Sequence, residues 1–66
     1  MTDVGMAIRV AQTKAKMPTA ELARRMGVKA PQVFRWRNQS DLRLSIVEQI
    51  AGIFDMTVSE FCELGR

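Results

Sequence analysis

The sequence predicts an all-α protein of five short helices, and three observations lead to that prediction. Apolar residues recur at intervals of three and four along most of the chain, and no stretch has the period of two that a strand requires. Pro18, Gly27 and Pro31 mark the first two junctions between periodic stretches, and the polar residues 39–43 form a loop at the third. The 66 residues form a single domain, since so short a chain buries only one core. The expected helices cover residues 3–15, 19–26, 30–38, 44–54 and 58–64.

The first helix is predicted by an apolar stripe at i, i+4, i+7 and i+11. The stripe consists of Val4, Ile8, Ala11 and Ala15. Polar residues, Gln12 among them, occupy the other faces. Gly5 has low helix propensity, so the first turn is expected to fray.

The second helix lies between a proline and a glycine. Pro18 suits a first turn, and Thr19 can cap it. Gly27 ends the helix, because glycine readily takes the left-handed conformation at that position. The inner face carries Leu22, Ala23 and Met26.

The third helix has Pro31 in its first turn, where a missing N–H costs nothing. Val33 and Trp36 share its inner face at i, i+3. The opposite face carries Pro31, Phe34, Arg35 and Asn38.

Apolar periodicity and a capping box predict the last two helices. The stripe of the fourth helix consists of Leu44, Val47, Ile50, Ala51 and Phe54. Its start has competing signals, because a Ser45-x-x-Glu48 capping box and the caps Ser40 and Asp41 are all available. Thr57-x-x-Glu60 is a capping box for the fifth helix, and Met56 and Phe61 are spaced as a hydrophobic staple. Gly65 is expected to close that helix.

The chain contains one cysteine, Cys62, and no histidine. This composition excludes a disulfide framework, a zinc site of Cys/His type and the Ser/His/Asp and Cys/His triads. Cys62 has no candidate base, so it is interpreted as a small buried apolar residue and not as a nucleophile. We therefore expect no enzymatic activity, no cofactor and no metal.

The chain carries no signal for export or for a membrane. No apolar run approaches the roughly 20 residues of a membrane span. The first residues lack the basic and then apolar stretches of a secretory signal. A lone cysteine suits a reducing compartment. The predicted location is the cytoplasm, with no membrane partner.

Positive charge is concentrated in the first two-thirds of the chain. Residues 9–43 hold nine basic and two acidic side chains, and so carry seven net positive charges. Residues 44–66 hold one basic and four acidic side chains, and so carry three net negative charges. A solvated surface of mixed charge explains the overall +3 but explains this separation less well. A basic front and an acidic back suit a polyanion bound on one side.

The second and third helices have the organisation of a helix-turn-helix unit. Gly27 permits the tight turn, and small or apolar residues stand where the two helices must pack. Residues 17–61 resemble the phage repressor/Cro-type helix-turn-helix family, also called the xenobiotic-response-element family. The strongest matches are Ala20-Glu21-Leu22-Ala23, Gly27-Val28, Val33, Arg35-Trp36, Asn38, Ile50-Ala51, Met56 and Ser59-Glu60-Phe61.

The resemblance implies a five-helix bundle whose third helix enters the major groove of double-stranded DNA. The base-contacting positions of the family fall on Ala30, Pro31, Gln32 and Arg35. Ala30 and Pro31 offer little hydrogen-bonding capacity. Base readout is therefore expected to shift to Gln32, Arg35 and Asn38, or to apolar contact with thymine methyl groups. Arg35 reads a base in one interpretation, and is a phosphate contact or a solvated side chain in the other.

The remaining family positions concern the DNA backbone. A phosphate contact falls on Thr19, and the cap of the third helix falls on Lys29, which cannot accept a capping hydrogen bond. Lys29 and Arg43 flank the third helix and are expected to touch phosphate. A Glu common in the family falls on Arg37 and its Arg partner on Gln12, so that ion pair is absent. Either Gln12 hydrogen-bonds Arg37, or Arg37 turns to a phosphate.

Two further positions carry open interpretations. Phe34 lies between the core face and the DNA face, and we expect it to pack at the edge of the fold in preference to touching a thymine methyl. Arg24 and Arg25 are either phosphate contacts or charges that suit the end of a helix.

The sequence therefore predicts a sequence-specific transcriptional regulator, a Cro-like repressor of phage or prophage type. The alternative is a protein-interaction module on the same fold, such as an antitoxin or accessory factor. A homodimer is expected, in solution or only on DNA, because operators of this kind have two half-sites. Its interface is placed on Val58, Phe61, Cys62 and Leu64, as the apolar surface left after core packing. With no further domain after the last helix, no small-molecule effector is expected.

Overall fold

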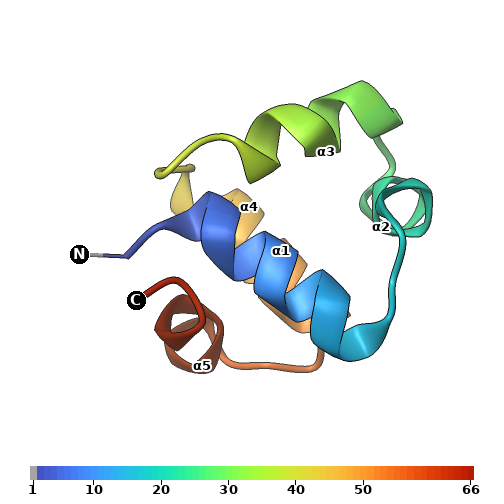
Figure 1. Cartoon of the computed structure of the whole chain (residues 1–66). Helices are drawn as coiled ribbons and strands as arrows, with labels where there is room; N and C mark the ends of the chain where they lie inside the picture. The colour runs from blue at the N-terminus through green and yellow to red at the C-terminus, as the bar shows by residue number, and fades with distance from the viewer. Residues whose placement is uncertain (1) are drawn as a thin grey trace.

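A computed structural model describes residues 2–66 of the chain. It contains five helices and, within that range, no strand; the helices are α1 (Val4–Ala15), α2 (Thr19–Met26), α3 (Ala30–Arg37), α4 (Leu44–Ile53) and α5 (Val58–Glu63). In Figure 1, α1 runs through the middle with α4 behind it, and α2 and α3 lie on the side opposite α5. The all-α prediction is confirmed, and each predicted helix is present with ends that differ by at most one residue.

All five helices contribute side chains to one core. Its buried apolar residues are Val4, Ala7, Ile8, Ala11, Leu22, Ala23, Val33, Trp36, Val47, Ile50, Ala51 and Phe61. Burying one large apolar side chain contributes about 1.5–3 kcal/mol. Leu22, Ala23, Val33 and Trp36 are among these buried residues, and Met26 packs against them. The inner faces predicted for α2 and α3 are thus confirmed.

Two residues of the predicted stripes lie outside the core. Ala15 is exposed in the last turn of α1, and 63% of the surface of Leu44 is exposed at the first residue of α4. The stripe prediction was wrong at both positions. Periodicity assigns a residue to a helix face, but it does not show where the neighbouring helix stops.

The first and last helices begin with capping side chains. The carboxylate of Asp3 accepts a hydrogen bond from the Met6 N–H at 3.1 Å. At α5 the predicted capping box is confirmed: the Glu60 N–H donates to the Thr57 hydroxyl at 3.1 Å, and the Thr57 N–H donates to the Glu60 carboxylate at 2.8 Å. These contacts satisfy N–H groups that a helix start otherwise leaves without partners.

The other three helices begin without a side-chain cap. Their N-cap residues are Pro18, Lys29 and Arg43. Thr19, predicted as a cap, is instead the first residue inside α2. The predicted caps of α4, which were Ser40, Asp41 and the Ser45 box, are likewise wrong, because the helix starts directly after Arg43.

Gly5 joins α1 to the loop that follows α3. Its N–H donates to the Gln39 carbonyl at 2.8 Å, and the neighbouring Val4 N–H donates to the Ser40 carbonyl at 3.0 Å. A Cβ on Gly5 would overlap the carbonyl oxygens of Arg37 and Gln39. The expectation of a frayed first turn was therefore wrong, since this turn is buried and holds the end of α3 in place.

The two ends of the chain meet beside α5. The Asp3 N–H donates to the Gly65 carbonyl at 2.9 Å, so the segments before α1 and after α5 lie close together (Figure 1). Gly65 was expected to close α5, but Leu64 is the C-cap, and its backbone is right-handed. Only Gly27 among the glycines of the described chain has a positive φ, and it ends α2 as predicted.

Candidate nucleic-acid interface

The helix-turn-helix unit is formed by α2, residues 27–29 and α3. Gly27 has a φ of 72°, and the Val28 N–H then donates to the Ala23 carbonyl at 3.0 Å, so the chain reverses within three residues. Leu22, Ala23 and Val33 are buried between the helices. This packing leaves one face of α3 outside, and all four residues predicted for that face are exposed: Pro31, Phe34, Arg35 and Asn38.

Four of the predicted DNA contacts, Pro31 among them, lie together around one hollow on α3. Lys29, Gln32 and Arg35 line a shallow hollow of about 360 Å³, together with Val28 and Trp36. The Arg35 side chain is exposed and forms no ion pair or hydrogen bond within residues 2–66. Its guanidinium is therefore uncommitted, which a base-reading arginine requires.

The other predicted base contacts differ in how available they are. Ala30 is half-buried against the core, whereas Pro31 is exposed. The Asn38 side chain is partly engaged, because its Nδ2 donates to the Phe34 carbonyl at 2.9 Å. One amide proton and the amide oxygen of Asn38 remain available.

Phe34 is half exposed and does not pack into the edge of the fold. Half of its surface is accessible, and the guanidinium carbon of Arg37 lies 5.5 Å from the centre of its ring. Burial was the expected outcome, so that expectation was wrong. The ring and the guanidinium form a cation–π pair, which restricts where Arg37 can point.

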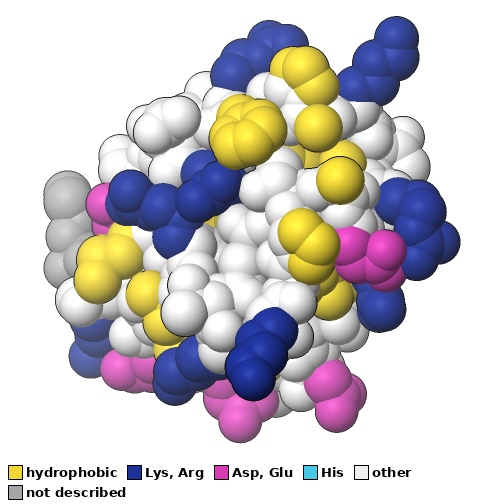
Figure 2. Space-filling model, turned by 45° about the vertical axis from the view of Figure 1, so that its right-hand side comes forward, with side chains coloured by type: hydrophobic (Ala, Val, Ile, Leu, Met, Phe, Trp, Pro, Cys, Tyr) yellow, Lys and Arg dark blue, Asp and Glu magenta, His cyan; other side chains and the backbone are white. Residues whose placement is uncertain are grey.

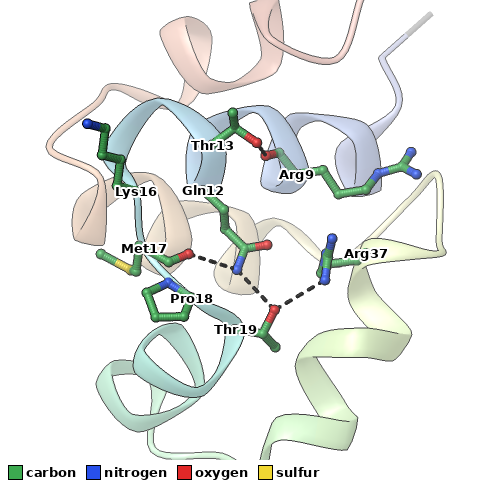
Figure 3. Close-up of a pocket in the computed structure, with 8 residues that line it drawn as sticks. All are labelled: Arg9, Gln12, Thr13, Lys16, Met17, Pro18, Thr19 and Arg37. Carbon is green, nitrogen blue, oxygen red and sulfur yellow. Dashed lines mark hydrogen bonds between the residues drawn. The ribbon is translucent and has the colours of Figure 1, made fainter.

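A second hollow opens where α1 ends, α2 begins and α3 ends (Figure 3). Its volume is about 410 Å³, and its lining residues are Arg9, Gln12, Thr13, Lys16, Met17, Pro18, Thr19 and Arg37. Three of them are cations and none is a carboxylate. The hollow therefore presents positive charge and no acidic group to an approaching ligand.

Gln12, Thr19 and Arg37 meet at the bottom of this hollow (Figure 3). The Gln12 Nε2 donates to the Met17 carbonyl at 3.3 Å and to the Thr19 hydroxyl at 3.2 Å. The Arg37 Nη1 donates to the same hydroxyl at 3.2 Å. Thr19 therefore bridges two side chains for which the sequence suggested a direct bond or a turn of Arg37 to phosphate.

Gln12 was predicted on an outer face of α1, and this prediction was wrong. Only 7% of its surface is exposed, and its Oε1 is buried without a hydrogen-bond partner, as is the Arg37 Nε. Arg9 and Lys16 also line this hollow, although neither was among the DNA contacts predicted from the sequence. The signal for Gln12 was present, because it occupies the helix-1 position at which the family carries an ion pair with helix 3.

The cations of this face divide into paired and unpaired groups. Arg24 and Arg25 both bind the Glu21 carboxylate, at 2.6 and 2.7 Å, so the interpretation as helix-end charges fits them better than phosphate contact. The hydrogen bonds from Arg24 and then Arg25 lower the pKa of Glu21. The unpaired cations within residues 2–66 include Lys29, Arg35, Arg37 and Arg43.

The space-filling view shows how charge is distributed over one side of the molecule (Figure 2). Figure 2, turned to bring the α2 side forward, shows basic side chains spread across the face, with exposed apolar side chains among them. Acidic side chains lie mainly toward the lower and right-hand edges of that view. A positively charged face with a projecting helix is the arrangement that duplex DNA requires of a binding domain.

Comparison with known families agrees with this arrangement. The model of the Cro/C1-type HTH DNA-binding domain matches residues 7–65. The chain belongs to this family, as the resemblance of residues 17–61 predicted, and it is a DNA-binding domain of helix-turn-helix type. No curated protein and no solved structure matches the chain significantly. Across residues 2–66, none of the helices has the length and apolar character needed to cross a membrane.

Proposed function

We propose that this protein is a sequence-specific transcriptional repressor of the Cro-like, phage or prophage type, acting in the cytoplasm without enzymatic activity. The observation that supports this most directly is the outer face of α3, where Arg35 is exposed and free of ion pairs beside Gln32. In this proposal residues 30–38 occupy the major groove, which accepts one helix. The base-contacting residues are Arg35, Gln32, Asn38, Pro31 and Ala30.

Arg35 is the principal reader in this proposal. Arginine donates two parallel hydrogen bonds to O6 and N7 of guanine, and its position one turn after Pro31 points it away from the core. Gln32 lines the same hollow and supplies an amide that can pair with adenine. The exposed half of the Phe34 ring is available for a thymine methyl group.

The phosphate-contacting residues are Thr19, Lys29, Arg37 and Arg43. Lys29 and Arg43 are the N-caps of α3 and α4, and neither helix has a side-chain cap. Free backbone N–H groups and the positive end of the helix dipole favour an anion at such a position. A cationic N-cap residue adds to the same attraction.

We propose that the protein acts as a homodimer on two half-sites, with no small-molecule effector. The interface first placed on α5 must lose Phe61, which is fully buried in the core. Val58, Cys62 and Leu64 remain partly accessible there. They are not the only apolar surface left over, since the large exposed apolar residues are Met6, Phe34 and Leu44.

The test is selection of bound sequences from random duplex DNA, followed by titration of salt on the selected site. If about five phosphates are neutralised, log K against log[salt] should have a slope near −4 to −5. A selected site with two-fold symmetry, bound by two chains, supports the dimer. A flat salt response, or no binding to any duplex, contradicts the proposal and favours a protein-interaction module.

A further inference from the structure

The Thr19 hydroxyl has a single hydrogen-bonding option left. A threonine hydroxyl carries one proton and two lone pairs. Gln12 Nε2 and Arg37 Nη1 each donate to it at 3.2 Å, which occupies both lone pairs. Within residues 2–66 no group accepts the proton of this hydroxyl in return. Since Thr19 is only partly buried and lines the hollow, that proton is free to point outward.

The orientation of the Gln12 carboxamide is fixed by its surroundings. Its NH₂ group faces the Met17 carbonyl, at 3.3 Å. The reversed orientation would place the carboxamide oxygen against that carbonyl oxygen, which is repulsive. In Figure 3 the oxygen is turned toward Arg37, whose buried Nε has no partner. Gln12 is therefore held as a donor to Thr19.

The hollow in front of the hydroxyl suits a tetrahedral anion. Its three cations are Arg9 of α1, Lys16 at the C-cap of α1, and Arg37 at the last residue of α3. No carboxylate lines the hollow. Arg37 is held both by the Thr19 hydroxyl and by the ring of Phe34. Hydrogen bonds to a charged acceptor are about twice as strong as neutral ones, so a donor fixed in this place has a large effect on an anion.

We propose that Gln12 is a positioning residue for DNA, which through Thr19 builds a site for one backbone phosphate. By occupying a lone pair of the Thr19 hydroxyl, it commits the hydroxyl proton to a phosphodiester oxygen in the hollow. Arg37, Arg9 and Lys16 surround the same phosphate. This inference rests on the proposed function, and it assigns roles to Gln12, Arg9 and Lys16 that the sequence did not suggest.

The experiment replaces individual phosphates of the selected duplex by uncharged methylphosphonates. The intact chain should show one phosphate whose replacement weakens binding about tenfold or more through Thr19. Gln12→Met and Thr19→Val should each weaken binding to the unmodified duplex by a similar factor. For both variants, replacing that one phosphate should then have little further effect.

Two further variants sharpen this experiment. Gln12→Glu offers a carboxylate that accepts the Thr19 proton inward and captures Arg37, so binding should fall more than with Gln12→Met. Thr13→Val is the matched control, because the Thr13 hydroxyl lines the same hollow but already donates to the Arg9 carbonyl at 3.0 Å. This control should leave both the affinity and the methylphosphonate pattern unchanged.

Circular dichroism melting establishes that each variant is folded, and if Gln12→Met does not fold, Gln12→Glu gives the same test. The proposal is overturned if folded Gln12 variants keep full sensitivity at the phosphate that Thr19→Val loses. It is also overturned if only phosphates that depend on Lys29 are found, which leaves DNA binding itself intact. Failure of the unmodified chain to bind any duplex overturns this inference and the proposed function together.

Discussion

The helices of this domain begin in two different ways. α1 and α5, which pack against each other beside the chain termini, start with Asp3 and Thr57, whose side chains accept hydrogen bonds from the first turn. α2, α3 and α4 start at Pro18, Lys29 and Arg43, which provide no such bond. Both helices of the helix-turn-helix unit are thus uncapped, whereas capped α1 contributes only its far end, from Arg9 to Lys16, to the proposed phosphate site.

A capped and an uncapped helix start differ in the stability of the helix and in the charge at its N-terminus. A side-chain cap contributes about 1 kcal/mol, and a cation at the same position contributes none of it. Lys29 and Arg43 place a positive charge where a capping residue would otherwise stand. The N–H groups left free can bond to water, or to a phosphate if DNA is present.

The largest expected effect tests whether both kinds of helix depend on one core. Leu22, Val33 and Ile50 lie in the uncapped helices α2, α3 and α4, and all three are fully buried in the core that capped α1 and α5 share. Leu22→Asp, Val33→Asp or Ile50→Asp places an unpaired charge in a small core, and each should cost more than about 4 kcal/mol and unfold the domain. Thermal unfolding followed by circular dichroism measures this.

Leu44→Asp is the matched control for these core variants. Leu44 was predicted on the same stripe as Ile50, but most of its surface is exposed, and an acid suits the first turn of a helix. The melting temperature should change little. Cooperative melting near the normal temperature in any of the three core variants would show that the core does not unite the two regions.

The second effect distinguishes base readout from phosphate contact among the residues of α3 and its N-cap. Arg35→Ala should cost about 1–3 kcal/mol of binding free energy on the selected site and relax selectivity at one base pair. Lys29→Ala should weaken all sequences nearly equally and lower the salt slope by about one. Binding titrations on the selected site and on single-base variants measure both. If Arg35→Ala weakens all sequences equally, Arg35 holds the backbone, and Gln32 and Asn38 remain as readers.

The fold could be predicted from the sequence because its helices are short and periodic. Ile8, Leu22 and Val33 stand at the spacing that buries them, and Gly27 marks a turn that only a few residues can adopt. The capping residues were harder to predict than the helix starts, because several polar residues near α4 are capable caps and none is used. Which cap forms depends on where the core directs the chain, and a local sequence does not contain that information.

The candidate site could be predicted only in part, for a similar reason. The outer face of α3 follows from the helical period, so the exposure of Arg35 was foreseen. The burial of Gln12 was not, because a polar residue beside the apolar stripe is normally exposed. Its burial depends on Thr19 and Arg37 approaching from two other helices. Phe34 was misjudged because its burial also depends on a neighbouring helix.

The third effect exchanges the two kinds of helix start. Thr57→Ala removes a cap from α5 and should cost about 1 kcal/mol of stability while leaving DNA affinity unchanged. Lys29→Thr gives α3 the cap it lacks, so it should raise stability by several tenths of a kcal/mol and weaken DNA binding. Urea unfolding and binding titrations on the same samples measure both quantities. A Lys29→Thr variant that gains stability without losing affinity would remove the functional reason for the uncapped start.

The smallest effect concerns Glu21, whose carboxylate holds Arg24 and Arg25 on α2. These hydrogen bonds lower its pKa in the folded chain below the ordinary value of 4.5. The folded state therefore gains stability from this carboxylate above the unfolded pKa, and that gain is lost as the pH falls through the lower folded pKa. The group is exposed, so water and salt weaken the effect.

Glu21→Gln should be slightly less stable than the unmodified chain near neutral pH, with the difference disappearing in strong acid and shrinking in about 1 M salt. Glu48→Gln is the control, because Glu48 forms no ion pair within the described residues, and it should show no such difference. A Glu21→Gln difference in the free energy of unfolding that is the same at neutral and strongly acidic pH would mean that the carboxylate's charge contributes nothing to α2.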